Sequence, residues 1–188
     1  MPNYQGVWSL SEQYQNASGW PVPPLSGDIG LFFGPQNVIQ YIQISTLGDS
    51  ADFGDMTTNG EFPGVVASST RAVRGGDDQA TTVLDFVTIV SQGNATDFGD
   101  LVETSYGGLA GCGSSTRGLI GGGNIGSGHT SVIQYVTIAS TGNATTFGNL
   151  SEGRATLASF SSTTRGVWAG GDPAGASTSD RIDYVTIA

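Results

Sequence analysis

Residues 132–140 read VIQYVTIAS, and this stretch decides the fold class. Its apolar residues do not keep to alternate positions: in a strand, Ile133 and Tyr135 would point to one side, and Val136 and Ile138 to the other. An antiparallel strand with one solvated face alternates apolar and polar residues. The stretch therefore predicts a β-strand that is covered by neighbouring structure on both faces.

The same pattern recurs along the chain at a constant distance from a second motif. Four copies, VIQYIQIS, VLDFVTIV, VIQYVTIA and RIDYVTIA, carry a central aromatic residue: Tyr41, Phe86, Tyr135 and Tyr184. A Phe-Gly pair follows 12 residues after the first three (41 to 53, 86 to 98, 135 to 147), which places Phe53, Phe98 and Phe147. A serine- and threonine-rich run then ends in an arginine: Arg71, Arg117 and Arg165. The Phe-Gly pairs are 45 and 49 residues apart (53 to 98, 98 to 147), the period of propeller blades such as WD40 and kelch.

We therefore predict an all-β fold of repeated units, each with four short antiparallel strands arranged like a β-propeller blade. In one unit the strands are RGLIGG, VIQYVTIAS, NATTFGNLS and ATLASFSST. The repeat domain is 28–188, and its units are 28–70, 71–116, 117–164 and the half unit 165–188. Closed propellers have about four to eight blades, so three and a half units leave three alternatives: several chains combine, the units form a different oligomeric β architecture, or the chain uses the repeat without a ring. We favour a homo-oligomer.

Residues 1–27 lie outside the repeat. Ser9 and Glu12 form a capping-box pattern, which predicts a short helix near residues 9–17. The segment is rich in aromatic side chains: Trp8, Tyr14 and Trp20. Two interpretations stay open, namely an attachment segment that docks on another subunit and a cover for an open edge of the β-array.

Composition argues against several classes of function. The net charge is −10 with six arginines and no lysine, which is unsuited to nucleic acid because phosphate binding depends on clustered cations. We expect neither a signal peptide nor a membrane span, because no basic region precedes an apolar run and no apolar stretch approaches about 18 residues. Synthesis in the cytosol follows. The single cysteine, Cys112, forms no zinc pattern and is expected to be a small buried residue rather than a nucleophile.

Two short motifs suggest nucleotide chemistry but lack the residues that it requires. The tetrapeptide DFGD at 52–55 and 97–100 contains a kinase metal-binding triplet, yet there is no lysine and no HRD loop. Its third copy, TFGN, loses both aspartates, so the recurring element is a turn with an aromatic residue. GGGNIG at 121–126 has dinucleotide-binding spacing but precedes a loop and a strand rather than a helix. We predict no catalytic, cofactor-binding or metal-binding residues and no enzymatic activity.

The remaining candidates are architectural arginines and one group of loops. Arg71, Arg117 and Arg165 recur at one position in three of the four units and suggest strand-end bracing through hydrogen bonds to carbonyls or acids. Length variation is concentrated after the glycine pairs, in DDQATT, NIGSGHTS and DPAGASTSD, and insertions in repeat folds often lie on the binding face. Asn124 and His129 are therefore candidate ligand residues of the loops, with an ordinary polar loop residue as the alternative for His129. Trp168 is included with them as an aromatic residue for contacting a sugar.

The combination of motifs resembles a known family. The segment YQGVWSLSEQYQNASGWP, followed by copies of YVTIASTGNATTFGNL and SSTRGLIGGG, is similar to the kelch-like repeat proteins encoded by tailed phages of cyanobacteria and other aquatic bacteria. The resemblance spans nearly the whole chain and implies a virion structural protein of the tail, fibre, baseplate or head decoration. It implies no catalytic residues.

Two functional hypotheses follow. The first is a non-enzymatic structural protein of a phage virion that assembles with other virion proteins and itself, made in the host cytoplasm, without nucleic-acid binding or membrane insertion. The alternative is a glycan-binding module for host adsorption, in which loop polar groups and an aromatic residue such as Trp168 contact a surface sugar.

Overall fold

The computed structural model describes residues 28–46, 48–174 and 178–187. Within these ranges the chain is all-β, as predicted, and contains no helix. The helix expected near 9–17 lies outside the described residues, as does all of segment 1–27. The strands are β1 (Ile29–Phe33), β2 (Val38–Gln43), β3 (Ala51–Asp55), β4 (Gly64–Ala67), β5 (Arg71–Gly75), β6 (Thr81–Thr88), β7 (Thr96–Ser105), β8 (Ala110–Gly113), β9 (Arg117–Gly121), β10 (Val132–Thr137), β11 (Thr145–Asn149), β12 (Arg154–Ala155), β13 (Ala158–Ser161), β14 (Arg165–Ala169), β15 (Asp172–Pro173) and β16 (Ile182–Thr186).

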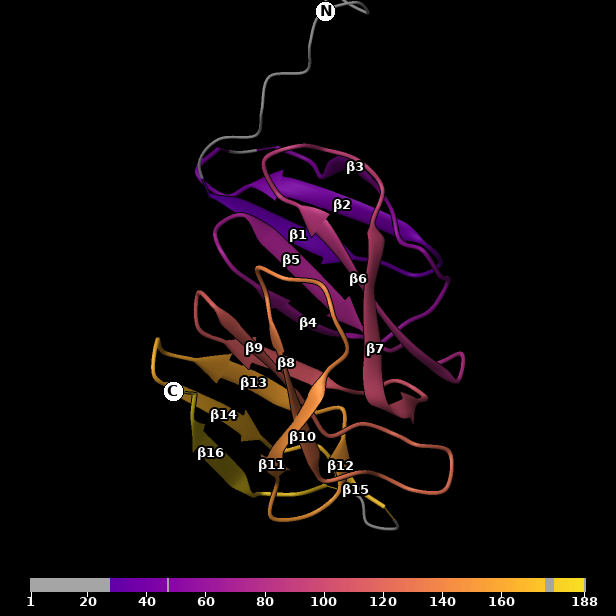
Figure 1. Cartoon of the computed structure of the whole chain (residues 1–188), viewed down its shortest axis with the longest axis vertical. Coiled ribbons are helices and arrows are strands. Elements are labelled where there is room, and N and C mark those ends of the chain that lie inside the picture. Colours follow the sequence, from indigo (N-terminus) through magenta and orange to yellow (C-terminus); the bar gives the residue numbers. More distant parts are fainter. Residues whose placement is uncertain (1–27, 47, 175–177, 188) are drawn as a thin grey trace, which may run out of the picture.

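The strands form four antiparallel sheets and one short ribbon. The first sheet has the order β1-β2-β3, the second β4-β5-β6-β7, the third β8-β9-β10-β11 and the fourth β13-β14-β16, while β12 pairs with β15. The four sheets follow one another along the long axis of the molecule, with the first and fourth at opposite ends (Figure 1). The described residues therefore form an open stack rather than a closed ring.

The second, third and fourth sheets each begin one strand earlier than the unit defined from the sequence. The stretch ATLASFSST supplies β13, which pairs with β14 so that Phe160 lies opposite Val167. The connection between these strands is a tight turn in which the Ser162 amide donates to the Arg165 carbonyl at 2.9 Å, and its counterparts join β4 to β5 and β8 to β9. Because such a short turn returns the chain directly onto itself, each of these strands pairs with the strand that follows it.

The core lies between consecutive sheets rather than inside any one of them. We call the side of a sheet that faces the following sheet its forward face, and the opposite side its rear face. In the third sheet, Ile133 and Leu119 lie on the forward face, whereas Val136 and Ile120 lie on the rear face. All four are buried, with Ile138 beside Val136. The prediction that 132–140 is covered on both faces is confirmed.

The recurring Phe-Gly motif receives the hairpin of the following sheet. The amide of Gly142 donates to the Phe98 carbonyl at 2.7 Å, and the Asp100 amide donates to Oδ1 of Asn143 at 3.1 Å. A Cβ on Gly99 would lie 2.6 Å from the Gly142 carbonyl oxygen, so this approach requires glycine. The same bonds join the hairpin at Gly93 to β3. DFGD is therefore the backbone clamp between one sheet and the next.

Candidate interaction surfaces

The repeated arginines connect one sheet to the following sheet. Arg71 on β5 donates to the carbonyl of Ile138, just beyond β10, at 3.1 Å. Arg117 on β9 donates to the carbonyl of Ile187, just beyond β16, at 3.0 Å. Each guanidinium also lies over the aromatic ring of its own sheet, with Arg71 4.1 Å from the centroid of Phe86. These arginines thus stabilise the stacking of sheets through a carbonyl bond and a cation-π contact.

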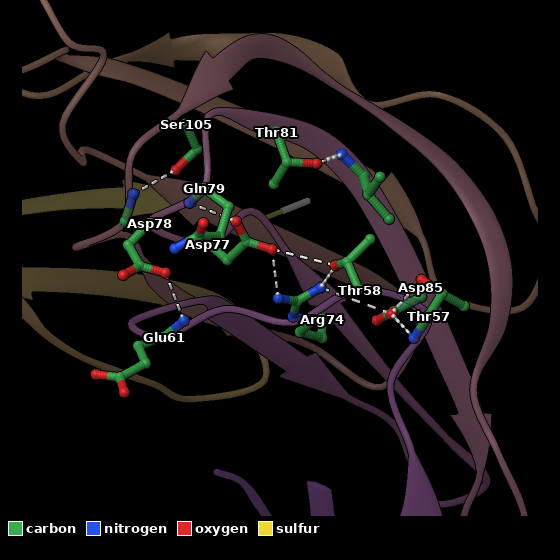
Figure 2. A network of polar contacts seen from close by, with 12 residues as sticks. Thr57, Thr58, Glu61, Arg74, Asp77, Asp78, Gln79, Thr81, Asp85 and Ser105 are labelled. Carbon is green, nitrogen blue, oxygen red and sulfur yellow. Dashed lines mark hydrogen bonds and ion pairs between the residues drawn. The ribbon is translucent and has the colours of Figure 1, made fainter. Parts of the chain in front are cut away.

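The most extensive charged network belongs to the interior. Arg74 on β5 donates to Oδ2 of Asp77 and to the Thr58 hydroxyl, both at 2.8 Å, and lies 3.6 Å from Asp85 (Figure 2). The side chains of Arg74, Asp77 and Asp85 are fully buried. Asp85 also accepts hydrogen bonds from the Thr57 amide and hydroxyl. The network holds the loop after β3 against the second sheet and offers no surface to a ligand.

A second buried arginine, Arg154, also joins two parts of the structure. Arg154 on β12 is paired with Asp183 on β16 and donates to the carbonyls of Gly170 and Arg181, at 2.6 Å and 3.0 Å. Its side chain is fully buried. Because Arg154 links the β12–β15 ribbon to the fourth sheet, we assign it a structural role.

Trp168 is a correction to the sequence-based expectation. It lies on β14 rather than in a loop, and its exposed fraction is 0%. The indole packs with Cys112, Leu119 and Ile133 between the third and fourth sheets, and its Nε1 donates to the Ala110 carbonyl at 3.0 Å. A tryptophan contributes most to stability when its ring is buried and its N–H is hydrogen-bonded. Trp168 is therefore a core residue, and a surface sugar cannot reach it.

The other two loop candidates lie at the edge of a shallow cleft. Asn124 and His129 pair across their loop, and the Asn124 side chain accepts the Gly126 amide at 2.8 Å. The cleft that they line also contains Phe62 and Tyr106, both exposed, from two segments that the sequence did not single out. Nδ1 of His129 is buried without a hydrogen-bond partner among the described residues. The cleft combines aromatic and polar groups at the loop side of the stack.

The forward face of the fourth sheet is a large exposed apolar surface at one end of the stack. Phe160, Ile182 and Tyr184 are 62%, 69% and 65% exposed. Val167 lies between them, opposite both Phe160 and Tyr184 in the strand register. Arg165 lies over the Tyr184 ring, 4.8 Å from its centroid. We call these five residues the forward end face.

The rear face of the first sheet is the corresponding surface at the other end. Phe32 on β1 is 51% exposed, and Ile44, just after β2, is 63% exposed. Gly30 and Ile42 lie opposite each other in the register, beside Phe32. We call Gly30, Phe32, Ile42 and Ile44 the rear end face. No residue of either end face was predicted from the sequence to be exposed, because these residues occupy the same positions of the repeat as residues that are buried between sheets.

Chemistry at the remaining reactive positions is limited. Burial raises the pKa of the Cys112 thiol to about 11, which disfavours the thiolate that nucleophilic attack requires.

Among the described residues, no group of three or more His, Cys, Asp and Glu side chains could hold a metal ion. The same ranges contain no helix long and apolar enough to cross a membrane. Trp8, Tyr14 and Trp20 lie outside the described residues, so their attachment role stays a prediction.

Comparison with models of known protein families gives no match, and comparison with curated proteins gives no significant match.

Proposed function

We propose that this chain is a non-enzymatic structural protein of a tailed-phage virion, a component of the tail, fibre, baseplate or head decoration that assembles with other virion proteins. One observation carries the assembly role. Both ends of the stack expose apolar side chains whose repeat counterparts are buried between sheets, as the pair Ile44 and Ile138 illustrates. Contiguous exposed apolar patches mark protein–protein contact sites. The virion assignment is supported by the motif combination described above.

We also propose that the sheets are propeller-type blades. The support is the meander order of strands in the second and third sheets, the face-to-face packing of consecutive sheets and the repeat period. In this interpretation the stack is an arc of blades, and segment 1–27 is the attachment segment.

Incorporation into particles tests the assembly role. Phe160→Asp places a charge on the forward end face, and we expect phage made with this chain to contain little of it, measured by mass spectrometry of purified particles. Phe62→Asp is the matched control, because Phe62 is 61% exposed but lies in the cleft beside Tyr106 and belongs to neither end face. Normal incorporation of both variants would contradict the proposal.

The cleft supports a second function, glycan binding during host adsorption. The observation in its favour is the pair of exposed aromatic residues, Phe62 and Tyr106, beside Asn124 and His129. Aromatic faces stack on sugar rings, and amides bond sugar hydroxyls. Tyr106→Ala is expected to reduce adsorption of phage to host cells while incorporation stays normal; unchanged adsorption would contradict this function.

A further inference from the structure

We propose that the forward end face of one chain binds the rear end face of a second copy, so that chains join head to tail. This inference rests on the proposed assembly role and names the partner. It follows from comparing the two end faces with the joints that the chain already forms between its own sheets.

Two of the internal joints, those that follow the second and third sheets, have a common construction. A side chain on the first strand of one sheet lies against a glycine in the second strand of the next: Val66 against Gly118, and Cys112 against Gly166. A Cβ on Gly166 would lie 2.8 Å from Sγ of Cys112, so the glycine is what allows this approach. Each of these joints adds the arginine bond described above and buries the isoleucine whose carbonyl accepts it.

The forward end face supplies one half of such a joint. Phe160 pairs with Val167 as Cys112 pairs with Leu119, so Phe160 occupies the position of the side chain that lies against the glycine. Arg165 holds the position of Arg71 and Arg117 and keeps the cation-π contact. Its guanidinium donates no hydrogen bond to a carbonyl of the described residues. Arg165 is therefore positioned like Arg71 and Arg117 but lacks, within the described ranges, the carbonyl acceptor that each of them has in the following sheet.

The rear end face supplies the other half. Gly30 lies on β1 at the position of Gly118 and Gly166, opposite Ile42 as Gly118 is opposite Val136. The Ile44 amide bonds the Asp28 carbonyl at 2.8 Å, as the Ile138 amide bonds the Thr116 carbonyl at 2.9 Å. Ile44 is therefore the counterpart of the isoleucines that accept the arginines. Its own side chain is exposed, whereas Ile138 and Ile187 are buried.

Superposing the two halves predicts specific contacts. Phe160 of one copy lies on Gly30 of the other, and Arg165 donates to the carbonyl oxygen of Ile44. Two forward faces cannot make this joint, because neither contains the glycine that receives Phe160. The contact is heterologous, so repeated copies form a ring or a filament.

Light scattering over a concentration series tests the association. We expect the purified chain to reach the mass of two or more copies below about 1 mM, where even weak contacts are populated. Phe160→Asp should keep the mass of one chain, whereas Phe62→Asp should behave like the unaltered chain. A single-chain mass for the unaltered protein, or unchanged assembly of Phe160→Asp, would overturn the inference. Loss of assembly in Phe62→Asp as well would show that the contact is not confined to the ends, and would also overturn it.

Disulfide trapping tests the direction of the contact. In a Cys112→Ser background, a chain with Gly30→Cys is mixed with a chain with Phe160→Cys under oxidising conditions. We expect covalent dimers in the mixture and none in either chain alone, because in the internal joint a Cβ at position 166 would lie 2.8 Å from Sγ of Cys112, close enough for a disulfide. Dimers of the Phe160→Cys chain alone would indicate face-to-face pairing and contradict the inference.

The two proposals fail separately. A chain that stays monomeric but is still incorporated through its forward end face would overturn head-to-tail joining and leave the assembly role intact. Normal incorporation of Phe160→Asp into particles, together with loss of its self-association, would contradict the assembly role and leave head-to-tail joining intact.

Discussion

The fourth sheet has two faces of similar composition but opposite environment. On its rear face, Trp168 and Ile187 are fully buried against the third sheet. On its forward face, Phe160 and Tyr184 are more than half exposed, although their counterparts Cys112 and Tyr135 lie in a core joint. The comparison teaches that apolar residues at these repeat positions are suited to contact a neighbouring sheet. They are buried where such a sheet is present and exposed where it is not.

The largest effect is expected from truncating an aromatic residue inside the joint. Trp168→Ala removes the indole and its bond to the Ala110 carbonyl and should lower the free energy of unfolding by about 3–5 kcal/mol. Phe160→Ala, on the opposite face of the same sheet, should change it by no more than about 0.5 kcal/mol. Urea denaturation measures both. Equal losses would mean that the forward end face is covered within one chain.

Glycines of the Phe-Gly motif provide a smaller and more local comparison. Gly99 has φ of +146° and lies against the Gly142 hairpin, whereas no atom comes within 4 Å of a Cβ on Gly148. Gly99→Ala should therefore destabilise the chain by about 1–3 kcal/mol through overpacking and backbone strain. Gly148→Ala should have almost no effect on the same urea midpoint. A cost at Gly148 similar to that at Gly99 would contradict the clamp.

The smallest expected effect on stability concerns the thiol. Burial raises the pKa of the Cys112 thiol to about 11, so the folded chain holds this proton more tightly than the unfolded chain does. The stability that the protonated thiol contributes is therefore present below the ordinary thiol pKa and is lost as pH rises through about 11. At pH 8 we expect a thiol reagent to modify native Cys112 at least about tenfold more slowly than Phe160→Cys in the Cys112→Ser background. Rates followed by absorbance decide this, and equal rates would show that Cys112 is accessible.

Residue patterns correctly predicted the structural features that depend on neighbouring residues in the sequence. The double-sided apolar pattern of 132–140 predicted a strand covered on both faces, and the constant spacing from Tyr41 to Phe53 predicted a recurring unit. Both follow from strand periodicity and chain length between turns. Trp168 was grouped with the ligand loop as an aromatic residue for a surface sugar, but it lies within β14, and its side chain packs in the joint between the third and fourth sheets.

The amino-acid sequence by itself determined the all-β class, the repeat and the residues that recur in it, because alternation and spacing depend on neighbours within a few positions. Only the tertiary structure decided which sheet receives each contact: that Arg71 bonds the carbonyl of Ile138 in the following sheet, and that Arg74 is buried beside Asp77. The same holds for the two end faces, since Tyr135 and Tyr184 occupy equivalent sequence positions. Their environments differ because burial is created by a neighbouring surface, and a sequence motif does not state whether that surface is present.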